Sequence, residues 1–288
     1  MKSYLSLIKF AHTVFALPFA LIGYFLGTQV SHERMHLRTL VLVLLCMVFA
    51  RSAAMAFNRY ADLSIDAANE RTKRRELPSG IISPGAALGF VAVCSLLFIV
   101  SAYFINPICF YLSPVALVVI LGYSYTKRFT AFSHFVLGLG LALAPVGAYL
   151  AVTGSFDLLP CLLGAVVLFW VGGFDIIYAI QDINFDSDNR LHSIPVWLGP
   201  SGALRLSTAS HLLCALLLIT VVIMLANTIP GVVGWLMYVG AAIFLGLLWY
   251  QHSIVKPSDL SRVNVAFFTT NGIASVLFGA FVILAFYI

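Results

Sequence analysis

Residues 39–80, TLVLVLLCMVFARSAAMAFNRYADLSIDAANERTKRRELPSG, join an apolar run to a charged loop. The apolar part, residues 39–57, carries a single charged side chain, that of Arg51. A helix needs about 20 apolar residues to span the hydrocarbon core of a bilayer, and this run is of that length. The following residues, 58–80, gather acidic, amide and basic side chains in one short segment. The stretch therefore predicts a membrane-spanning helix that ends in a polar site.

The rest of the chain repeats the composition of this apolar run. Of its 288 residues, 61% are hydrophobic and 9% are charged, whereas about 25% of the residues of a soluble domain are charged. Long uninterrupted apolar runs favour α-helices over the alternating strands of a membrane β-barrel. We therefore predict an all-α, polytopic membrane protein: a single transmembrane domain over residues 1–288, whose nine helices form a bundle around a central cavity. The nine predicted spans are 11–30, 39–57, 86–105, 107–125, 134–152, 158–180, 203–227, 231–250 and 264–288.

The lysine and arginine residues predict which ends of the spans face the cytoplasm. With the N-terminus placed inside, thirteen of the sixteen fall on inner segments, Arg34 and Arg38 fall outside, and Arg51 lies within a span. Basic residues accumulate on the cytoplasmic side of membrane proteins, so the loops after spans 2, 4, 6 and 8 are predicted to be cytoplasmic. The net charge of +5 then reflects membrane topology, and no nucleic-acid partner is implied.

The sequence also gives information on targeting signals and on patterns of cysteine spacing. The first span lacks a small-residue cleavage site, so we expect a retained helix and not a removed signal peptide. The absence of an Arg- and Ser-rich transit peptide favours a prokaryotic plasma membrane. The five cysteines are scattered over apolar spans, a spacing that gives neither a disulfide framework nor a zinc site.

Two of the predicted cytoplasmic loops are acidic, and their oxygen-bearing side chains recur every four residues. The loop after span 2 carries Asn58, Asp62 and Asp66, and the loop after span 6 carries Asp182 and Asp186. Residues four apart lie on one face of a helix, so each set should project together where its span leaves the membrane. Four spans separate the two motifs in sequence, and their weak similarity is compatible with an internal duplication.

Closely spaced carboxylates near a membrane repel one another, and a bound cation would relieve that repulsion. Mg²⁺ takes oxygen ligands and is usually held by one or two carboxylates together with substrate phosphates. The two acidic motifs could therefore hold two Mg²⁺ ions with a diphosphate between them. The simpler alternative is that these acids are solvated loop residues that balance the neighbouring Lys and Arg side chains.

Basic side chains beside the acidic motifs are candidates to contact a diphosphate, which Arg binds through a bidentate fork. Basic residues on inner loops also obey the positive-inside rule whatever the protein does. Arg51 differs, because it lies inside span 2, about two helical turns before Asn58, and a charge at that depth is costly enough to indicate function. The loop candidates are Arg71, Lys73, Arg74, Arg75, Lys127 and Arg128.

Four segments together carry a resemblance to a known family. Residues 58–80 combine an Asn-xxx-Asp-xxx-Asp core, a basic stretch and an R-x-L-P-x-G ending, and residues 175–195, DIIYAIQDINFDSDNRLHSIP, hold a second Asp-xxx-Asp core. With GYSYTKRFT at 122–130 and IKFAHTVFALPFALIG at 8–23, they resemble the UbiA superfamily of intramembrane prenyltransferases. The segment at 8–23 is similar to the opening of its 4-hydroxybenzoate polyprenyltransferase branch. One position departs from the pattern: Arg59 stands where many members have Asp.

The resemblance implies an enzyme that transfers a polyprenyl group from polyprenyl diphosphate to a small aromatic acceptor, 4-hydroxybenzoate, in quinone biosynthesis. It implies no obligatory protein partner, and it places the isoprenoid tail among helices open to membrane lipid. Charge on the leaving diphosphate would be stabilised by metal and cations. The implied Mg²⁺ ligands are Asn58, Asp62, Asp66, Asp182 and Asp186, of which the four aspartates also serve catalysis. The implied diphosphate contacts are Arg51, Arg71, Arg75, Lys127 and Arg128.

The remaining implied site residues concern the allylic carbocation and the acceptor. Three tyrosines are candidates to shield the cation by cation–π contact, although each is equally suited to packing. Asp175 is a candidate to orient or deprotonate the acceptor, and Lys9 and His12 to bind its carboxylate. The three tyrosines are Tyr123, Tyr125 and Tyr178.

Three alternatives remain at this stage. The acceptor could be a dihydroxynaphthoate of menaquinone biosynthesis. It could also be a chlorin, a haem vinyl group or a glycerol phosphate. A cation-coupled transporter, from a different class of protein, would use the acids as an ion site. Transporter sites generally lie near the bilayer midplane on broken helices, whereas the acids here follow the ends of spans, which favours the enzyme.

Overall fold

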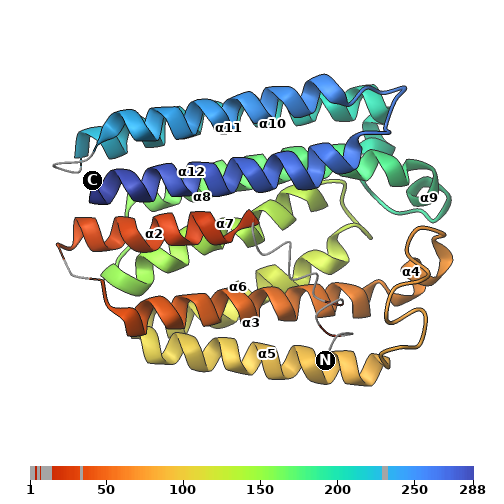
Figure 1. Ribbon diagram of the computed structural model, residues 1–288. Helices are drawn as coiled ribbons and strands as arrows, with labels where there is room; N and C mark the ends of the chain where they lie inside the picture. The colour runs from red at the N-terminus through yellow and green to blue at the C-terminus, as the bar shows by residue number, and fades with distance from the viewer. Residues whose placement is uncertain (1–3, 5–6, 8–14, 33–34, 229–232) are drawn as a thin grey trace. The chain divides into compact units, whose positions relative to one another are not determined.

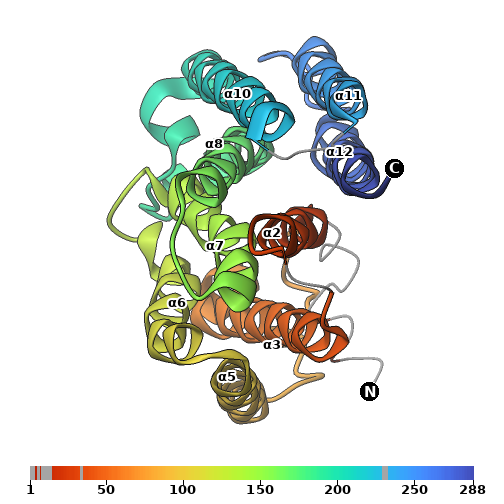
Figure 2. The same cartoon turned by 90° about the vertical axis from the view of Figure 1, so that its left-hand side faces the viewer.

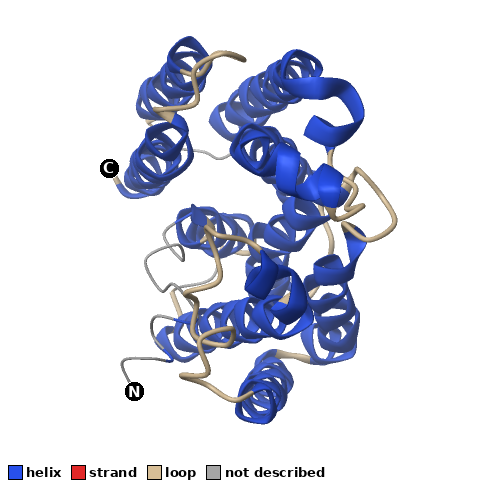
Figure 3. Ribbon diagram, turned by 90° about the vertical axis from the view of Figure 1, so that its right-hand side faces the viewer, coloured by secondary structure: helices blue, strands red, loops and turns tan. Residues whose placement is uncertain are grey.

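The computed structural model describes residues 4, 7, 15–32, 35–228 and 233–288. Within these residues the chain forms helices joined by turns and loops, as Figure 3 shows, and it contains no β-strand. The only β-type pairing that the described residues make is an isolated bridge between Lys256 and Asp259. The predicted all-α class is therefore confirmed.

Eight of the described helices are long and apolar enough to cross a membrane. A ninth, α2 (Leu17–Val30), is apolar but has 14 residues. Together they match the nine predicted spans, and the apolar length of each run explains why, since a helix rises only 1.5 Å per residue. The protein is an integral membrane protein of the polytopic helical type.

The chain divides into two compact units, of which the first is built on Leu37–Thr126. Its long helix α3 (Leu37–Ala61) packs against α5 (Pro84–Ile105), which Figure 1 shows beside it, and against α6 (Pro107–Thr126). The short helix α4 (Leu63–Ala68) follows α3. This unit therefore contains the whole first aspartate motif.

The second unit combines α2 with Lys127–Ile288. Helix α8 is central to it, because α8 packs against both α7 and α10, while α7 packs against α2 and α11 against α12. Figure 2 shows α11 and α12 side by side, seen along the helices. The prediction of one domain over residues 1–288 stays a prediction. The bounds are α7 (Ser133–Thr153), α8 (Leu158–Ala179), the 3₁₀ turn η2 (Ile180–Asp182), α9 (Ile183–Asp188), α10 (Ile194–Thr228), α11 (Gly234–Ile254), the π-helical segment η3 (Val265–Thr270) and α12 (Asn271–Tyr287).

Local sequence explains where several helices begin and end. Ser83 and Asp157 cap the N-termini of α5 and α8 by accepting hydrogen bonds from the backbone N–H groups of Ala86 and Leu159, as short polar side chains commonly do. Gly154 ends α7 in the left-handed conformation (φ 66°), which glycine adopts without steric cost. Helix α10 contains a kink at Gly199 (φ 68°).

Glycine also brings α7 and α8 unusually close together. A Cβ atom added to Gly138 of α7 would lie 2.4 Å from the backbone oxygen of Leu168 in α8. One added to Gly172 of α8 would lie 2.7 Å from the Phe135 ring of α7. Small residues are the usual means by which membrane helices approach each other. This close approach fixes the spacing between the side chains that α7 and α8 present to one another.

Candidate active site

The first aspartate motif lies on a helix joint and not on one regular helix. Helix α3 ends at Ala61, α4 begins at Leu63, and Asp62 lies between them with φ −95° and ψ 11°. A regular helix has ψ near −42°, so the prediction of one continuous helical face is wrong at this residue. The α-type hydrogen bonds survive, from Asp62 N to Asn58 O (3.0 Å) and from Asp66 N to Asp62 O (2.7 Å). The joint is therefore a change of backbone conformation at one residue that keeps the α-type hydrogen bonds on both sides of it.

Asn58 and Asp62 remain together across this joint. The Asn58 side-chain amide donates a hydrogen bond to Asp62 Oδ2 over 3.2 Å, and Asp62 is only 3% exposed. The pair places a carboxylate and an amide, both of which carry hard oxygen donors, at the C-terminal end of α3. Oxygen donors of this kind suit Mg²⁺.

Asp66 has a different environment, because the loop that follows α4 folds back onto it. Arg75 Nη1 lies 2.7 and 2.8 Å from the two carboxylate oxygens of Asp66, and Arg59 Nη1 lies 3.8 Å from Oδ2. Thr72 Oγ1 donates a hydrogen bond to the Asp66 backbone oxygen over 3.0 Å. Charge-assisted bonds of this length are strong. Asp66 therefore anchors the basic loop in this structure.

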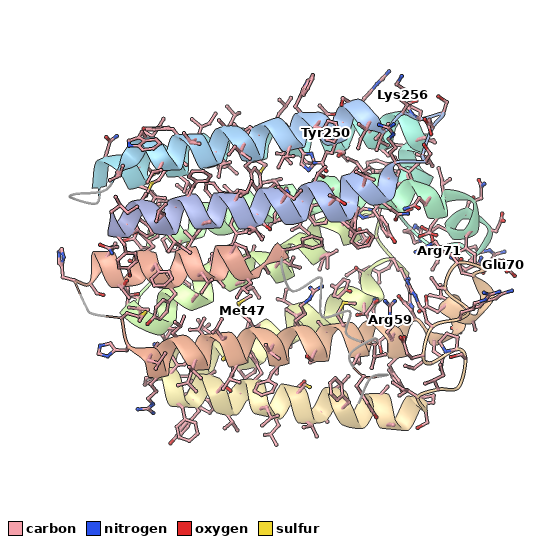
Figure 4. All side chains as sticks on the ribbon, in the orientation of Figure 1. Met47, Arg59, Glu70, Arg71, Tyr250 and Lys256 are labelled. Atoms are coloured by element: carbon pink, nitrogen blue, oxygen red, sulfur yellow. The ribbon has the colours of Figure 1, made fainter. Side chains whose placement is uncertain are left out.

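Two arginines of α3 have unused hydrogen-bond donors. Among the described residues, Nε of Arg51 and Nε of Arg59 are buried and have no hydrogen-bond partner. Both guanidinium groups interact electrostatically with Tyr123 of α6. Arg59 is 5% exposed. In the sequence it stood out only as a departure from the family pattern. Its spacing of seven residues from Asp66, about two helical turns, is the signal by which it could have been found. Figure 4 shows Arg59 on α3, and Glu70 and Arg71 in the loop after α4.

The second aspartate motif repeats the joint. Helix α8 ends at Ala179, the 3₁₀ turn η2 runs to Asp182, and α9 begins at Ile183. Asp182 has φ −100° and ψ 6°, so the regular helix predicted for Asp182 and Asp186 is also interrupted. The cause is the tighter 3₁₀ turn, which commonly forms at the C-terminus of an α-helix.

Asp186 lies near both charges and hydroxyls of its own unit. Its carboxylate interacts electrostatically with Asp182, Lys127 and His134, and it hydrogen-bonds to the Ser193 side chain. The backbone N–H of His192 donates to Lys127 O over 2.7 Å. The basic pair at 127–128 is thereby tied to the second aspartate motif.

Asp175 is paired with a residue that the sequence did not single out. His134 Nδ1 of α7 lies 2.7 Å from Asp175 Oδ2 of α8, with the two side chains 5% and 22% exposed. In the part of the chain that the structure describes, nothing hydrogen-bonds to His134 Nε2, which is buried. The pair could not be inferred from spacing, because 41 residues separate its members.

The donors of each motif fit a divalent cation only in part. No group of three or more His, Cys, Asp or Glu side chains that could hold a metal ion occurs among the described residues. Each motif instead supplies two carboxylates, and the first adds the Asn58 amide. Mg²⁺ typically uses one or two carboxylates and completes its shell with water and substrate phosphates. The residues present therefore fit Mg²⁺ that is bound together with a phosphorylated ligand.

Comparison of the sequence with models of known protein families identifies its family over almost the whole length of the chain. Residues 16–285 match the model of the UbiA prenyltransferase family. The chain belongs to this family.

Curated UbiA relatives cover most of this chain. A 4-hydroxybenzoate octaprenyltransferase of Nitrosomonas eutropha is 31% identical over 242 residues, which is 83% of this chain and 81% of the relative. One of Aliivibrio fischeri is 30% identical over 247 residues, 83% and 81% of the two chains. The predicted enzyme class, an aromatic prenyltransferase, agrees with the names of these relatives.

Solved UbiA structures share the fold. A UbiA homologue from Aeropyrum pernix, solved in its apo form, is 33% identical, with a TM-score of 0.83 over 95% of this chain and 97% of the homologue. A homologue from Archaeoglobus fulgidus, solved with GPP and Mg²⁺ bound, has a TM-score of 0.75 at 23% identity and covers 99% of this chain. The second likeness concerns the fold alone.

The other predicted site residues have varied surroundings in this UbiA member. Tyr178 stacks on Phe267 with ring centroids 4.2 Å apart, and Tyr125 packs edge-on against Phe57 at 5.7 Å. These contacts suit packing as well as cation shielding, as the sequence suggested. Arg71 and Arg128 are exposed, and Lys9 and His12 lie outside the described residues.

Proposed function

We propose that this protein transfers a polyprenyl group from polyprenyl diphosphate to 4-hydroxybenzoate, with Mg²⁺, in quinone biosynthesis. The observation that carries the proposal is the shared geometry of the two aspartate motifs. Each places its first aspartate at a helix joint, where carboxylates emerge from an apolar helix beside basic side chains. The names of the curated relatives support this donor class and acceptor.

In this proposal the two motifs bind one diphosphate through two Mg²⁺ ions. Asn58, Asp62, Asp182 and Asp186 would hold the ions, and Asp66 would join them once Arg75 turns from its carboxylate toward the diphosphate. Bound Mg²⁺ supplies Lewis-acid stabilisation of charge on the leaving group. The solved Archaeoglobus fulgidus homologues with GPP or DMAPP and Mg²⁺ make this ligand pair the natural one to test.

The basic side chains would neutralise the diphosphate oxygens. Within the described residues, Arg51 and Arg59 have buried Nε–H groups without an acceptor, and a buried donor left unsatisfied costs about 1–3 kcal/mol. An anionic ligand that accepts from them removes that cost. The predicted loop contacts Arg71, Lys127 and Arg128 complete the proposed set.

The chemical step separates charge and then forms a carbon–carbon bond. The allylic C–O bond of the donor breaks with its electron pair on diphosphate, and a ring carbon of the acceptor attacks the allylic cation. Tyr123, Tyr125 and Tyr178 are the proposed faces for that cation. The apolar helices exclude the water that would otherwise quench it, and a long prenyl tail is accommodated among membrane lipid. We place the enzyme in a prokaryotic plasma membrane with its aspartate motifs on the cytoplasmic side.

Two aromatic acceptors, 4-hydroxybenzoate and a dihydroxynaphthoate, are compatible with this proposal. Lys9 and His12 are proposed to bind the carboxylate of 4-hydroxybenzoate. A dihydroxynaphthoate carries the same two functional groups, a carboxylate and a phenol, so the same two contacts are proposed for either acceptor. The choice between them is made by experiment.

The test is product formation by the purified protein in detergent. Polyprenyl diphosphate and Mg²⁺ are supplied with 4-hydroxybenzoate or 1,4-dihydroxy-6-naphthoate in parallel reactions, each repeated with EDTA and with Asp62→Asn. Asp188→Asn serves as the matched control, because Asp188 is exposed at the end of α9. We expect a prenylated product that disappears with EDTA and with Asp62→Asn and persists with Asp188→Asn. No product from either acceptor would overturn the proposed acceptor class, and no binding of polyprenyl diphosphate would overturn the transferase itself.

A further inference from the structure

The buried His134 and the partly buried Asp175 form a pair between two packed membrane helices. His134 lies in the first turn of α7 and Asp175 in the last turns of α8, and Nδ1 and Oδ2 are 2.7 Å apart. Ionisable side chains inside a membrane protein are costly and usually serve its function. Asp175 lies seven residues before Asp182, which ends the 3₁₀ turn η2 after α8.

Backbone packing holds the two side chains in register. Gly138 lies one turn after His134, and its lack of a Cβ lets α7 approach the backbone of α8 at Leu168. Gly172, three residues before Asp175, accepts the Phe135 ring in the same way. The pair is therefore positioned by rigid helices and not by a loop, as the precise placement of a functional group requires.

The carboxylate of Asp175 determines which nitrogen of His134 is available. A carboxylate accepts a hydrogen bond, so it selects the tautomer with hydrogen on Nδ1 and leaves a lone pair on Nε2. Within the described residues that Nε2 is buried and without a hydrogen-bond partner. A carboxylate that orients an imidazole and stabilises its protonated form is the arrangement of a general base.

We propose that His134 Nε2 accepts the phenolic proton of the aromatic acceptor, with Asp175 as the positioning residue that orients the imidazole. This inference rests on the proposed function and revises the role expected for Asp175 from direct contact to action through His134. It requires an acceptor with a hydroxyl group on the ring, which both 4-hydroxybenzoate and the dihydroxynaphthoate have.

The proposed step balances as follows. The acceptor O–H bond breaks, its proton moves to His134 Nε2, and its electron pair forms a carbonyl as the ring carbon ortho to it bonds to the allylic carbon. The allylic C–O bond electrons remain on diphosphate. The resulting cyclohexadienone regains aromaticity by losing its ring proton and gaining one at oxygen. His134 then returns its proton to solvent, so one proton is released per transfer.

Charged side chains surround His134. Asp175 bonds to it directly, and Asp186 interacts with it electrostatically. Lys127 interacts in turn with Asp186. A purely structural ion pair would have the same neighbours, so the decisive measurement must report on proton transfer.

The experiment compares wild type, His134→Gln and Asp175→Asn with a series of ring-fluorinated 4-hydroxybenzoates. Fluorine lowers the phenol pKa, so a larger share of the acceptor is already deprotonated and needs no base. We expect His134→Gln to lower kcat for 4-hydroxybenzoate by about 10²–10³-fold, the usual range for a general base, with Mg²⁺-dependent binding of polyprenyl diphosphate unchanged. The ratio of wild-type to variant rates should then fall steadily as the phenol becomes more acidic. Asp175→Asn should show the same trend, and His36→Gln, on an exposed side chain, should leave the ratio at one.

Two outcomes would overturn the inference. If His134→Gln reacts at the wild-type rate, His134 is not the general base. If its rate is reduced but the ratio of wild-type to variant rates stays constant across the acceptor series, the His134–Asp175 pair has a structural role. If His134→Gln fails to bind polyprenyl diphosphate, His134→Ala is assayed with added imidazole instead. Turnover restored by imidazole would support His134 as the general base, and turnover that imidazole does not restore would contradict it. Failure of the proposed function is distinguishable, because the wild type itself would then prenylate none of these acceptors.

Discussion

Asp62 and Asp182 have nearly the same backbone conformation, φ −95° and ψ 11° for the first and φ −100° and ψ 6° for the second. Asp62 follows the last residue of α3, and Asp182 is the last residue of η2, the 3₁₀ turn after α8. Each precedes a helix of six residues, α4 or α9. Each short helix also carries an acid, Asp66 or Asp186, in its first turn. Two motifs that are far apart in sequence have therefore converged on, or inherited, one local geometry. This likeness strengthens the case for an internal duplication and leads to the first prediction.

Because the helix joints at Asp62 and Asp182 are alike, we expect loss of the carboxylate charge at either joint to weaken Mg²⁺ binding to a similar extent. Asp62→Asn and Asp182→Asn each keep the side-chain shape but remove a carboxylate from one joint. We expect each to raise the Mg²⁺ concentration for half-maximal activity by about 10-fold or more, as disturbed metal sites commonly do. Asp188→Asn should leave it unchanged. Mg²⁺ titrations of the three variants measure this, and a shift in only one of the two joint variants would show that the motifs have different roles.

The pair between the buried Asp66 and the partly buried Arg75 should contribute to stability far more than an exposed pair in the same loop. Arg75→Gln removes the shorter ion pair of the Asp66 carboxylate, which is 6% exposed, and leaves the weaker contact to Arg59. Breaking a buried pair costs about 3–5 kcal/mol. Lys73→Gln breaks the Lys73–Glu70 pair (2.6 Å), whose side chains are 43% and 86% exposed, and should cost less than about 1 kcal/mol.

Thermal unfolding of the two variants in the same detergent makes this comparison. Equal stability of Arg75→Gln and Lys73→Gln would mean that solvent reaches Asp66 and that the loop is not anchored by it. Added polyprenyl diphosphate and Mg²⁺ should widen the difference between the variants, because Arg75→Gln lacks a proposed diphosphate contact and therefore gains less stability from the ligand.

Much of the fold, but less of the site, could be predicted from the sequence. Apolar run lengths specify the spans because the bilayer has a fixed thickness, and α8 (Leu158–Ala179) differs from its predicted bounds by one residue. The joint at Asp62 could not be foreseen, because it depends on a ψ angle that periodicity does not encode. The contact of His134 with Asp175 depends on the approach of α7 to α8, which only the structure shows.

The approach of α7 to α8 should be sensitive to a single methyl group. In Gly138→Ala the new Cβ would lie 2.4 Å from Leu168 O, so the helices must separate, at a cost of about 1–3 kcal/mol. Gly147→Ala in the same helix meets nothing within 4 Å and should be neutral or slightly stabilising, since alanine favours helix over glycine. We also expect Gly138→Ala to lower activity by lengthening the His134–Asp175 contact. Unfolding temperatures and initial rates of both variants test this, and wild-type activity in a destabilised Gly138→Ala would separate helix spacing from catalysis.

A second buried polar cluster should stabilise the C-terminal helices without affecting turnover directly. Asn271 accepts a hydrogen bond from Trp170 Nε1 over 2.8 Å and donates to the backbone oxygens of Ala266 and Phe267, each over 3.0 Å. Those carbonyls belong to the π-helical segment η3, where the regular ladder leaves backbone groups that need other partners.

Asn271→Leu removes these bonds and leaves the Trp170 indole N–H buried without an acceptor. We expect it to lower the free energy of unfolding by about 1–3 kcal/mol, near the upper limit found for hydrogen bonds between membrane helices. Asn264→Leu, on the exposed residue just before η3, is the matched control. Denaturation in mixed detergent measures both variants, and tryptophan fluorescence reports the Trp170 environment. If Asn271→Leu were as stable as Asn264→Leu, η3 would be maintained by helix contacts and not by the amide.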